Sequence, residues 1–221
     1  MPALFDKFAT AMIQKPDSLI FDMDGTLWDA VDMYACAWNH VLKQTGIAAQ
    51  VSRAELAGMV GWEGQKVMDT LMPGINSTRQ LEVYDKVNEK QSQLSQDECI
   101  IYEGVKEGLE LLSTQYKLFI VSNCAKGVIQ RFINWAGISD YITDEFAYGI
   151  NHMPKNHNIK LLVDKYNLQA PVYVGDTEGD SKQSRLAGVP FVLVTYGFGT
   201  TDDFDQKFND FTSLTTHFMG L

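Results

Sequence analysis

The sequence predicts an α/β protein in which a doubly wound parallel sheet carries a small α-helical domain inserted after its first strand. Three observations predict this class. Short apolar segments alternate with amphipathic segments, as they do in βαβ units. Glycines follow two of the amphipathic segments, where helices would end. A long interval without a convincing strand follows the first strand, and a chain of 221 residues has room for such an insertion.

The strands of the sheet are predicted from four short segments rich in Val, Ile, Leu or aromatic residues, the composition of strands covered on both faces. These segments are residues 18–21, 117–121, 172–174 and 191–194. Helices of the same sheet domain are predicted at residues 104–112, 127–135, 158–166 and 180–186. Gly137 and Gly188 are predicted to end two of these helices, because glycine is the common residue just past a helix.

The interval after the first strand is predicted to be helical, because its apolar residues recur every three or four positions. Three sets show this spacing: Val31, Ala35, Trp38 and Leu42; Val67, Met68 and Leu71; and Leu81, Tyr84, Val87 and Leu94. We therefore predict a helical domain at residues 30–100 and a core domain made of residues 1–29 and 101–221. An extra N-terminal helix is predicted from Phe5, Phe8, Ala9 and Met12.

Charge and composition indicate which classes of partner and which cellular compartment to expect. The formal net charge of −10 argues against nucleic acid polymers and anionic membrane surfaces, which are bound through clustered Lys and Arg. The chain has no apolar run long enough to span a membrane and no targeting segment at its start. Three scattered cysteines fit a reducing compartment. We expect a cytoplasmic monomer or homodimer that acts on a small molecule.

Two carboxylates follow the first predicted strand, in the segment Asp22-Met23-Asp24-Gly25-Thr26. Ligands of open α/β sheets bind at the carboxyl ends of the strands. Residues two apart in an extended segment point the same way, so Asp22 and Asp24 could face one reacting group, one attacking and the other moving a proton. The alternative for this segment alone is ordinary Asp-Gly turn chemistry.

Polar groups follow the later strands as well. Ser122 and Asn123 offer a hydroxyl, an amide and backbone N–H groups to phosphoryl oxygens, although both are also common helix caps. Lys155 precedes a predicted helix and could neutralise phosphoryl charge, with Lys126 and Lys160 as rival candidates.

An acidic loop, Gly175-Asp176-Thr177-Glu178-Gly179-Asp180, follows the third predicted strand of the sheet domain. Carboxylates in such a loop suit a hard cation such as Mg²⁺, which prefers oxygen ligands. The alternative is a solvated turn in which Asp180 caps the next helix. The segments that end the strands thus supply the parts of a site for an anionic substrate.

Taken together in this order and spacing, the segments 22–26, Ser122-Asn123, Lys155 and 175–180 resemble the four motifs of the haloacid dehalogenase superfamily, in its phosphoglycolate phosphatase and beta-phosphoglucomutase branch. The resemblance covers nearly the whole chain, and residues 30–100 resemble the helical cap of these proteins. The third motif departs from a common pattern of the superfamily, since no proline follows Lys155.

The resemblance implies a role for each matched residue. Asp22 matches the nucleophile and Asp24 the general acid and base, while Ser122, Asn123 and Lys155 match the groups that bind the phosphoryl oxygens. The implied ligands of Mg²⁺ are the carboxylates of Asp22 and Asp176, the backbone carbonyl of Asp24, and Asp180 either directly or as a residue that orients the others.

The resemblance therefore implies a Mg²⁺-dependent phosphatase that hydrolyses a small phosphorylated metabolite through an aspartyl-phosphate intermediate. An aspartate nucleophile divides a very slow reaction into two steps. The first alternative is a phosphomutase similar to beta-phosphoglucomutase, which by eye has a histidine where this chain has Tyr34. A dehalogenase is third, because dehalogenating relatives lack an aspartate matching Asp24. A non-catalytic binding module is the remaining class.

Two further segments are assigned through the resemblance. Residues 61–66 resemble the cap loops that reach over the active site, and they are the candidate specificity segment. The alternative is that Trp62 packs between helices and that Glu63 begins one of them. Arg53 and Lys66 could meet a substrate anion, although most such residues are solvated surface. Trp28 and Asp29 are expected to pair with the stretch near residues 98–103 as a two-stranded hinge between the two domains.

Overall fold

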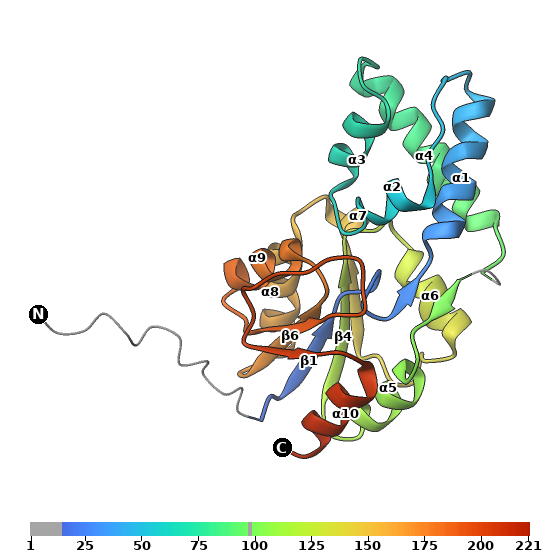
Figure 1. The fold of residues 1–221 in the computed structure, drawn as a ribbon. Helices are drawn as coiled ribbons and strands as arrows, with labels where there is room; N and C mark the ends of the chain where they lie inside the picture. Colours follow the sequence, from blue (N-terminus) through green and yellow to red (C-terminus); the bar gives the residue numbers. More distant parts are fainter. Residues whose placement is uncertain (1–14, 97–98) are drawn as a thin grey trace, which may run out of the picture.

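A computed structural model describes residues 15–96 and 99–221. The N-terminal helix expected from Phe5, Phe8, Ala9 and Met12 lies outside these residues. Two elements dominate the described chain, a six-stranded sheet with helices on both faces and a helical lobe at the carboxyl ends of its strands (Figure 1). The predicted doubly wound sheet with a helical domain inserted after the first strand is confirmed.

The sheet has the strand order β5-β4-β1-β6-β7-β8, and every neighbouring pair is parallel. Its strands are β1 (Ser18–Phe21), β4 (Lys117–Ser122), β5 (Asp144–Ala147), β6 (Pro171–Gly175), β7 (Phe191–Val194) and β8 (Gln206–Phe208). The central strand β1 is completely buried, and its last residue, Phe21, is aligned with Ile120 of β4 and Val174 of β6. The carboxyl ends of these three strands therefore meet at one place.

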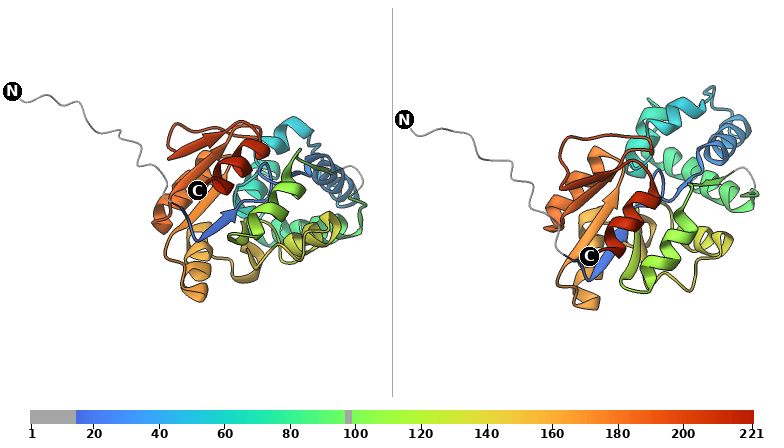
Figure 2. Two further views of the ribbon diagram at one scale, coloured as in Figure 1. Left: turned by 90° about the horizontal axis from the view of Figure 1, so that it is seen from below. Right: turned by 60° about the horizontal axis from the view of Figure 1, so that its bottom comes forward.

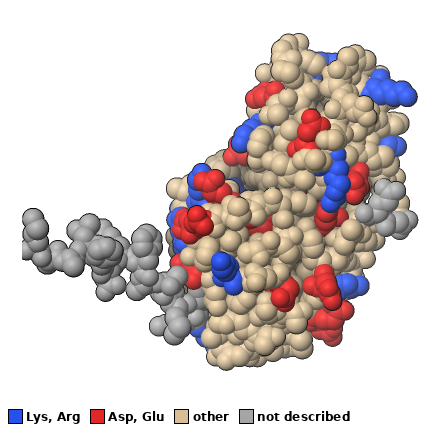
Figure 3. Space-filling model, viewed as in Figure 1, with Lys and Arg blue, Asp and Glu red and all other residues tan. Residues whose placement is uncertain are grey.

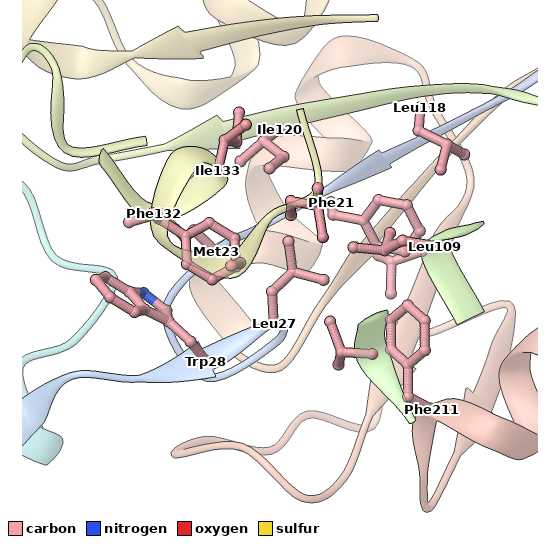
Figure 4. Packing of buried hydrophobic residues seen from close by; sticks show 14 of the residues in the cluster. Phe21, Met23, Leu27, Trp28, Leu109, Leu118, Ile120, Phe132, Ile133 and Phe211 are labelled. Carbon is pink, nitrogen blue, oxygen red and sulfur yellow. The ribbon is translucent and has the colours of Figure 1, made fainter. Parts of the chain in front are cut away.

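Alternate residues of β1 face two separate hydrophobic layers, as the two-residue period of a strand requires. Leu19 and Phe21 pack with α5 (Val105–Ser113), α6 (Val128–Ala136) and α10 (Phe211–Met219). Figure 4 shows Phe21 close to Leu109 and Phe211 in this layer. On the other face, Ile20 packs with α8 (Lys155–Tyr166), which lies against α9 (Glu178–Ala187). The views in Figure 2 show helices on both sides of the sheet.

The inserted lobe has its own hydrophobic core, which explains why it folds as a unit beside the sheet. It consists of α1 (Val31–Gln44), α2 (Arg53–Ala57), α3 (Gly64–Leu71) and α4 (Ser77–Gln93). Trp38, Met68 and Val87 are among its buried residues. Leu81 was predicted on the buried face of α4, but it is 49% exposed, because the packed face of that helix runs through Val83 and Val87.

The lobe is joined to the sheet domain through a short antiparallel ribbon of β2 (Trp28–Asp29) and β3 (Ile100–Ile101). Trp28 is aligned with Ile101 and Asp29 with Ile100. The predicted pairing of Trp28 and Asp29 with the segment that leaves the lobe is therefore present within the described residues. A motion of the lobe about this ribbon stays a prediction.

Candidate active site

Three of the predicted site residues meet at the carboxyl edge of the sheet because their strands are neighbours. Asp22 follows β1, Ser122 ends β4 and Asp176 follows β6. All three are at least nine-tenths buried. The backbone N–H of Asp22 donates to the carbonyl of Val174 at 2.8 Å, which fixes the first motif directly beside the acidic loop. Segments more than 150 residues apart in sequence are thus brought to one point.

The two oxygens of the Asp22 carboxylate have different surroundings. Its Oδ1 lies 3.0 Å from the Lys155 ammonium. Its Oδ2 is buried and has no hydrogen-bond partner among the described residues. Burial, followed by the charge of Asp180, raises the pKa of Asp22 well above its ordinary value, and Lys155 opposes this rise. An unpartnered buried carboxylate oxygen is unusual and indicates a site for a ligand.

Lys155 is the lysine that the fold brings to this carboxylate. It is 2% exposed, and its Nζ also donates to Asp180 Oδ1 at 2.6 Å. The rival candidates Lys126 and Lys160 are exposed side chains. Burial alone lowers the pKa of Lys155, but the Asp180 and Asp22 carboxylates together raise it well above its ordinary value. Lys155 is therefore held as a cation. It is also the first residue of α8, a helix that begins earlier than the sequence predicted.

Asp180 is fixed in the first turn of α9. The side chain of Thr177 accepts from the backbone N–H of Asp180 at 3.1 Å, and Asp180 Oδ2 accepts in return from the Thr177 hydroxyl and N–H at 2.6 and 3.1 Å. This reciprocal pair is a capping box, which stabilises the first turn of α9. The N-cap residue is therefore Thr177 and not Asp180, which completes the capping box as the third residue of the helix while its other oxygen accepts from Lys155.

Asp176 is held in place by backbone groups of a distant loop. Its Oδ2 accepts from the N–H groups of Phe198 at 2.7 Å and Gly199 at 3.3 Å. Gly25 lies against the same carboxylate with a φ of 86°, and a Cβ at Gly25 would come within 2.4 Å of Asp176 Oδ2. Only glycine allows this approach. Burial, followed by the charge of Asp180, raises the pKa of Asp176 to about 7.

The side chains present fit a hard divalent cation. Oxygens of Asp22, Asp176 and Asp180 lie within 4.8 Å of one another, and all three residues are buried. Asp22 Oδ2 has no hydrogen-bond partner among the described residues, so it could bind a cation. When all three carboxylates are ionised, their charge exceeds that of the single Lys155 ammonium, and a bound cation would neutralise the excess. Carboxylate oxygens are the ligands that Mg²⁺ prefers.

Asp24 is connected to the inserted lobe. Its Oδ1 accepts from the Tyr34 hydroxyl at 2.7 Å and from Trp28 Nε1 at 3.0 Å. Burial raises the pKa of Asp24 to about 6, and these two hydrogen bonds oppose the rise. The sequence did not reveal either partner. Tyr34 lies on the first predicted helix of the insertion, so only the three-dimensional entry angle of that helix brings it to Asp24.

The second motif also contacts the lobe. Ser122 is 3% exposed at the end of β4. Asn123 follows it, and its side-chain amide donates to the carbonyl of Gly61 at 2.8 Å. Asn123 Oδ1 is buried without a hydrogen-bond partner among the described residues. The chain therefore reaches the sheet domain at Gly61, whereas residues 64–66 form the first turn of α3 with Glu63 as its N-cap residue, as the alternative for this segment expected.

A cavity lies between the lobe and the carboxyl edge of the sheet and holds about 720 Å³ of space, its mouth included. Asp22, Asp24 and Ser122 form part of its floor. Residues of α1, α3, α4 and the segment between α2 and α3 form the opposite wall. The predicted nucleophile, acid and phosphoryl-binding serine thus line the same cavity, whose mainly apolar lining with a few polar groups is typical of a small-ligand site.

Fold and site together define a protein with a doubly wound α/β sheet domain, paired aspartates after its first strand and an inserted helical lobe. The family model described as haloacid dehalogenase-like hydrolase matches residues 19–194. The chain belongs to this family. The prediction of a superfamily member of the phosphatase type is confirmed at this level.

Relatives and solved structures agree with the family. The chain is 25% identical over 209 residues to a phosphoglycolate phosphatase of Rhodobacter capsulatus, covering 89% of this chain and 94% of the relative. It is 27% identical over 193 residues to the probable phosphatase IndB of Dickeya dadantii, covering 83% of each. The fold is similar to that of a predicted phosphatase from Clostridium acetobutylicum, with a TM-score of 0.81, 18% identity and coverage of 94% of this chain and 100% of that one.

The helices and the surface charges bear on two classes of partner, membranes and nucleic acids. No helix within residues 15–96 and 99–221 is both long and apolar enough to cross a membrane. On the face shown in Figure 3, acidic and basic side chains are interspersed, without a continuous basic surface of the kind that binds nucleic acid.

Proposed function

We propose that this chain is a Mg²⁺-dependent phosphatase that resembles the phosphoglycolate phosphatases in mechanism and hydrolyses a small phosphate monoester through a phosphoryl group carried by Asp22. The observation that carries the proposal is the state of the Asp22 carboxylate. One oxygen is held by Lys155, and the other is buried at the cavity floor without a hydrogen-bond partner in the described chain. A buried carboxylate held in this way is oriented to act as a nucleophile.

In the first step, an oxygen of Asp22 attacks the phosphorus of the monoester, and the bond from phosphorus to the leaving oxygen breaks. Lys155 lies 3.0 Å from Asp22 and stabilises the negative charge of the phosphoryl group during transfer. Ser122, at the end of β4 on the cavity floor, donates to a phosphoryl oxygen. Asp24 donates a proton to the leaving alkoxide, which departs as an alcohol.

In the second step, Asp24 acts as a carboxylate and removes a proton from water. The water oxygen attacks the phosphorus, the bond to Asp22 breaks, and inorganic phosphate leaves. The geometry of Asp24 supports both steps. Tyr34 and Trp28 hold its Oδ1, and its Oδ2 has no hydrogen-bond partner among the described residues and stays available for proton transfer. Asp22 and Asp24 face the same cavity.

Mg²⁺ would be held by Asp22, Asp176 and Asp180, together with the backbone carbonyl of Asp24, and when bound it would neutralise charge on the phosphoryl oxygens. The support is the cluster of three buried carboxylates, in which Asp22 has an oxygen without a partner among the described residues. The contacts of Asp176 with Phe198 and Gly199 hold its carboxylate in position for this purpose.

Residues 30–100 would form the cap and residues 1–29 and 101–221 the catalytic core, with the β2-β3 ribbon between them. Two hydrogen bonds join cap and core at the site, from Tyr34 to Asp24 and from Asn123 to Gly61. A cap in this position excludes water from the first transfer step. The cytoplasmic location and the monomeric or dimeric state remain predictions from the sequence.

A phosphomutase is less well supported than a phosphatase. A mutase that moves a phosphoryl group between two positions of one sugar must hold a second phosphate at some stage, and a second phosphate needs cationic groups in the cap. Among the described residues, the cavity wall opposite Asp22 carries neither Lys nor Arg. A non-catalytic binding module is also disfavoured, since the four buried site residues Asp22, Asp24, Asp176 and Lys155 are all in place.

Release of inorganic phosphate from a panel of phosphate monoesters tests the proposal, with Mg²⁺ and with EDTA, for the natural protein and for Asp22→Asn. The proposal expects release that needs Mg²⁺ and is lost in Asp22→Asn. Asp140→Asn, at a residue exposed on the surface, is the matched control and should leave the rate unchanged. Release that continues unchanged in Asp22→Asn or in EDTA would overturn it.

A further inference from the structure

The wall of the cavity opposite Asp22 is built mainly from aromatic and aliphatic side chains. Tyr34 and Trp38 come from α1, Met59 and Trp62 from the segment between α2 and α3, and Tyr84 from α4. These groups face the space into which the alcohol part of a monoester bound at Asp22 would extend. Aromatic and apolar walls of this kind bind planar or apolar groups and provide little solvation for a charge.

Cationic side chains are absent from the lining that the described residues provide. Lys155 lies beneath the cavity floor, where Asp22 and Asp180 occupy its ammonium. The cap residues that the sequence suggested for a substrate anion are engaged elsewhere. Arg53 forms ion pairs with Asp29 and with Asp32, the latter at 2.7 Å.

Lys66, the second suggested cation, lies outside this cavity. Its ammonium is 3.5 Å from the ring centroid of Trp62, a cation–π contact. It lines a neighbouring pocket together with Glu178 and Lys182 rather than the space above Asp22. A substrate carboxylate or second phosphate in the main cavity would therefore lack a cationic partner.

Two uncharged amides complete the wall. Asn88 and Gln91 lie one turn apart on α4 and line the cavity. Neither side chain has a hydrogen-bond partner among the described residues, whereas the buried amide of Gln80 on the same helix donates to the carbonyls of Met68 and Met72. Free amides beside aromatic rings suit a ring whose edge both donates and accepts hydrogen bonds.

We propose that the leaving group of the substrate is an uncharged alcohol that carries a planar ring, with polar atoms on its edge, rather than a carboxylate or a second phosphate. This inference rests on the proposed phosphatase function. The ring would lie between the aromatic side chains of the cavity, with its polar edge at Asn88 and Gln91. A carboxylate in the same place would be desolvated without a partner, which is costly.

Three probes of different leaving groups test the inference: uridine 5′-monophosphate, phenyl phosphate and 2-phosphoglycolate. The measurement is kcat/KM for phosphate release with Mg²⁺. For the natural protein we expect the two ring esters to exceed 2-phosphoglycolate by about tenfold or more, because the carboxylate is buried unpaired. Asn88→Leu should lower kcat/KM for uridine 5′-monophosphate several-fold more than for phenyl phosphate, which has no polar ring edge.

A lysine placed in the cavity supplies the missing cation and provides the converse test. Asn88→Lys should raise the ratio of kcat/KM for 2-phosphoglycolate to that for phenyl phosphate by about tenfold. Ser92→Lys adds the same charge to an exposed position of the same helix outside the cavity, so it should leave the ratio unchanged.

The outcomes separate this inference from the proposed function. If 2-phosphoglycolate is the best of the three probes and Asn88→Lys does not favour it further, the inference is overturned, while Mg²⁺-dependent release lost in Asp22→Asn still supports the phosphatase. If none of the three probes nor any other monoester of the panel is hydrolysed, the proposed function fails and the inference fails with it.

Discussion

Replacement of Lys155 by methionine should destabilise the folded protein strongly in the absence of Mg²⁺. Methionine keeps most of the buried volume and removes only the ammonium, which lies 2.6 Å from Asp180 and 3.0 Å from Asp22 and belongs to a side chain that is 2% exposed. Removing one partner of a buried ion pair costs about 3–5 kcal/mol, because the remaining charge is left uncompensated. Three buried carboxylates would then face one another without a cation.

The assay is urea denaturation followed by tryptophan fluorescence. For a chain of this size, the free energy of unfolding falls by about 3 kcal/mol per M of urea. A loss of about 3 kcal/mol in this free energy therefore lowers the urea concentration at the unfolding midpoint by about 1 M. Lys160→Met, at an exposed position of the same helix, is the control and should change the midpoint little. Because Mg²⁺ would supply positive charge at the same carboxylates, saturating Mg²⁺ should recover part of the loss.

Phosphate release by Lys155→Met provides a second measurement. Lys155→Met should release phosphate about 10²–10³-fold more slowly even when folded, since a donor aimed at the developing charge is lost. Equal midpoints of Lys155→Met and Lys160→Met in EDTA would mean that the buried ammonium does not stabilise these carboxylates. An equal loss in Lys155→Met with and without Mg²⁺ would mean that Mg²⁺ does not bind to them.

Three further perturbations follow from the geometry of the site. Tyr34→Phe removes the 2.7 Å hydrogen bond to Asp24 and should lower kcat for phosphate release about tenfold. Circular dichroism should show little change in the fold. An unchanged kcat would contradict the positioning of Asp24 by the cap. Gly25→Ala should lower the melting temperature by several degrees, because the new Cβ would lie 2.4 Å from Asp176 Oδ2 and the backbone φ is 86°. A melting temperature equal to that of the natural protein would exclude this close approach. Mg²⁺ should raise the melting temperature of the natural protein but not that of Asp176→Asn, and equal shifts in both would remove Asp176 from the metal site.

The buried parts of the sheet could be predicted from the sequence because their composition is distinctive. β1 and β7 were placed with the correct ends, since both are completely buried and, apart from Ser18, apolar. β5 and β8 were missed because they are edge strands, with the sequences Asp-Glu-Phe-Ala and Gln-Lys-Phe, whose polar residues reach solvent.

Two helices of the sheet domain were missed, the short α7 (Tyr148–Asn151) and the longer α10, whose sequence contains a signal. α10 is rich in threonine, which has a low helix propensity, and this composition hides it. Its buried residues Phe211, Leu214 and Phe218 nevertheless recur at helical spacing, and Asp210 caps it by accepting from the N–H of Ser213. A search for apolar periodicity in the last residues would have found this helix.

The site followed from the sequence wherever a residue is fixed by its own strand or helix. Asp22, Ser122 and Asp176 lie at strand ends, and parallel strands that are neighbours must bring such residues together. The contact of Tyr34 with Asp24 could not be predicted in this way, because it depends on the angle at which the cap meets the core. The apolar character of the cavity wall has the same origin, since its residues come from several elements of the cap.

The central claim is that Asp22 carries the phosphoryl group during turnover. Its most direct test is rapid acid quenching of the enzyme during turnover of phenyl phosphate, followed by peptide mass spectrometry. Asp24→Asn should be used beside the natural protein, because it slows the activation of water while phenol, a good leaving group, needs little protonation. The account predicts a phosphoryl group on the peptide that contains Asp22, enriched in Asp24→Asn and absent in Asp22→Asn. Phosphate release without any phosphorylated peptide, or a phosphoryl group on another residue, would contradict the role of Asp22 as the nucleophile.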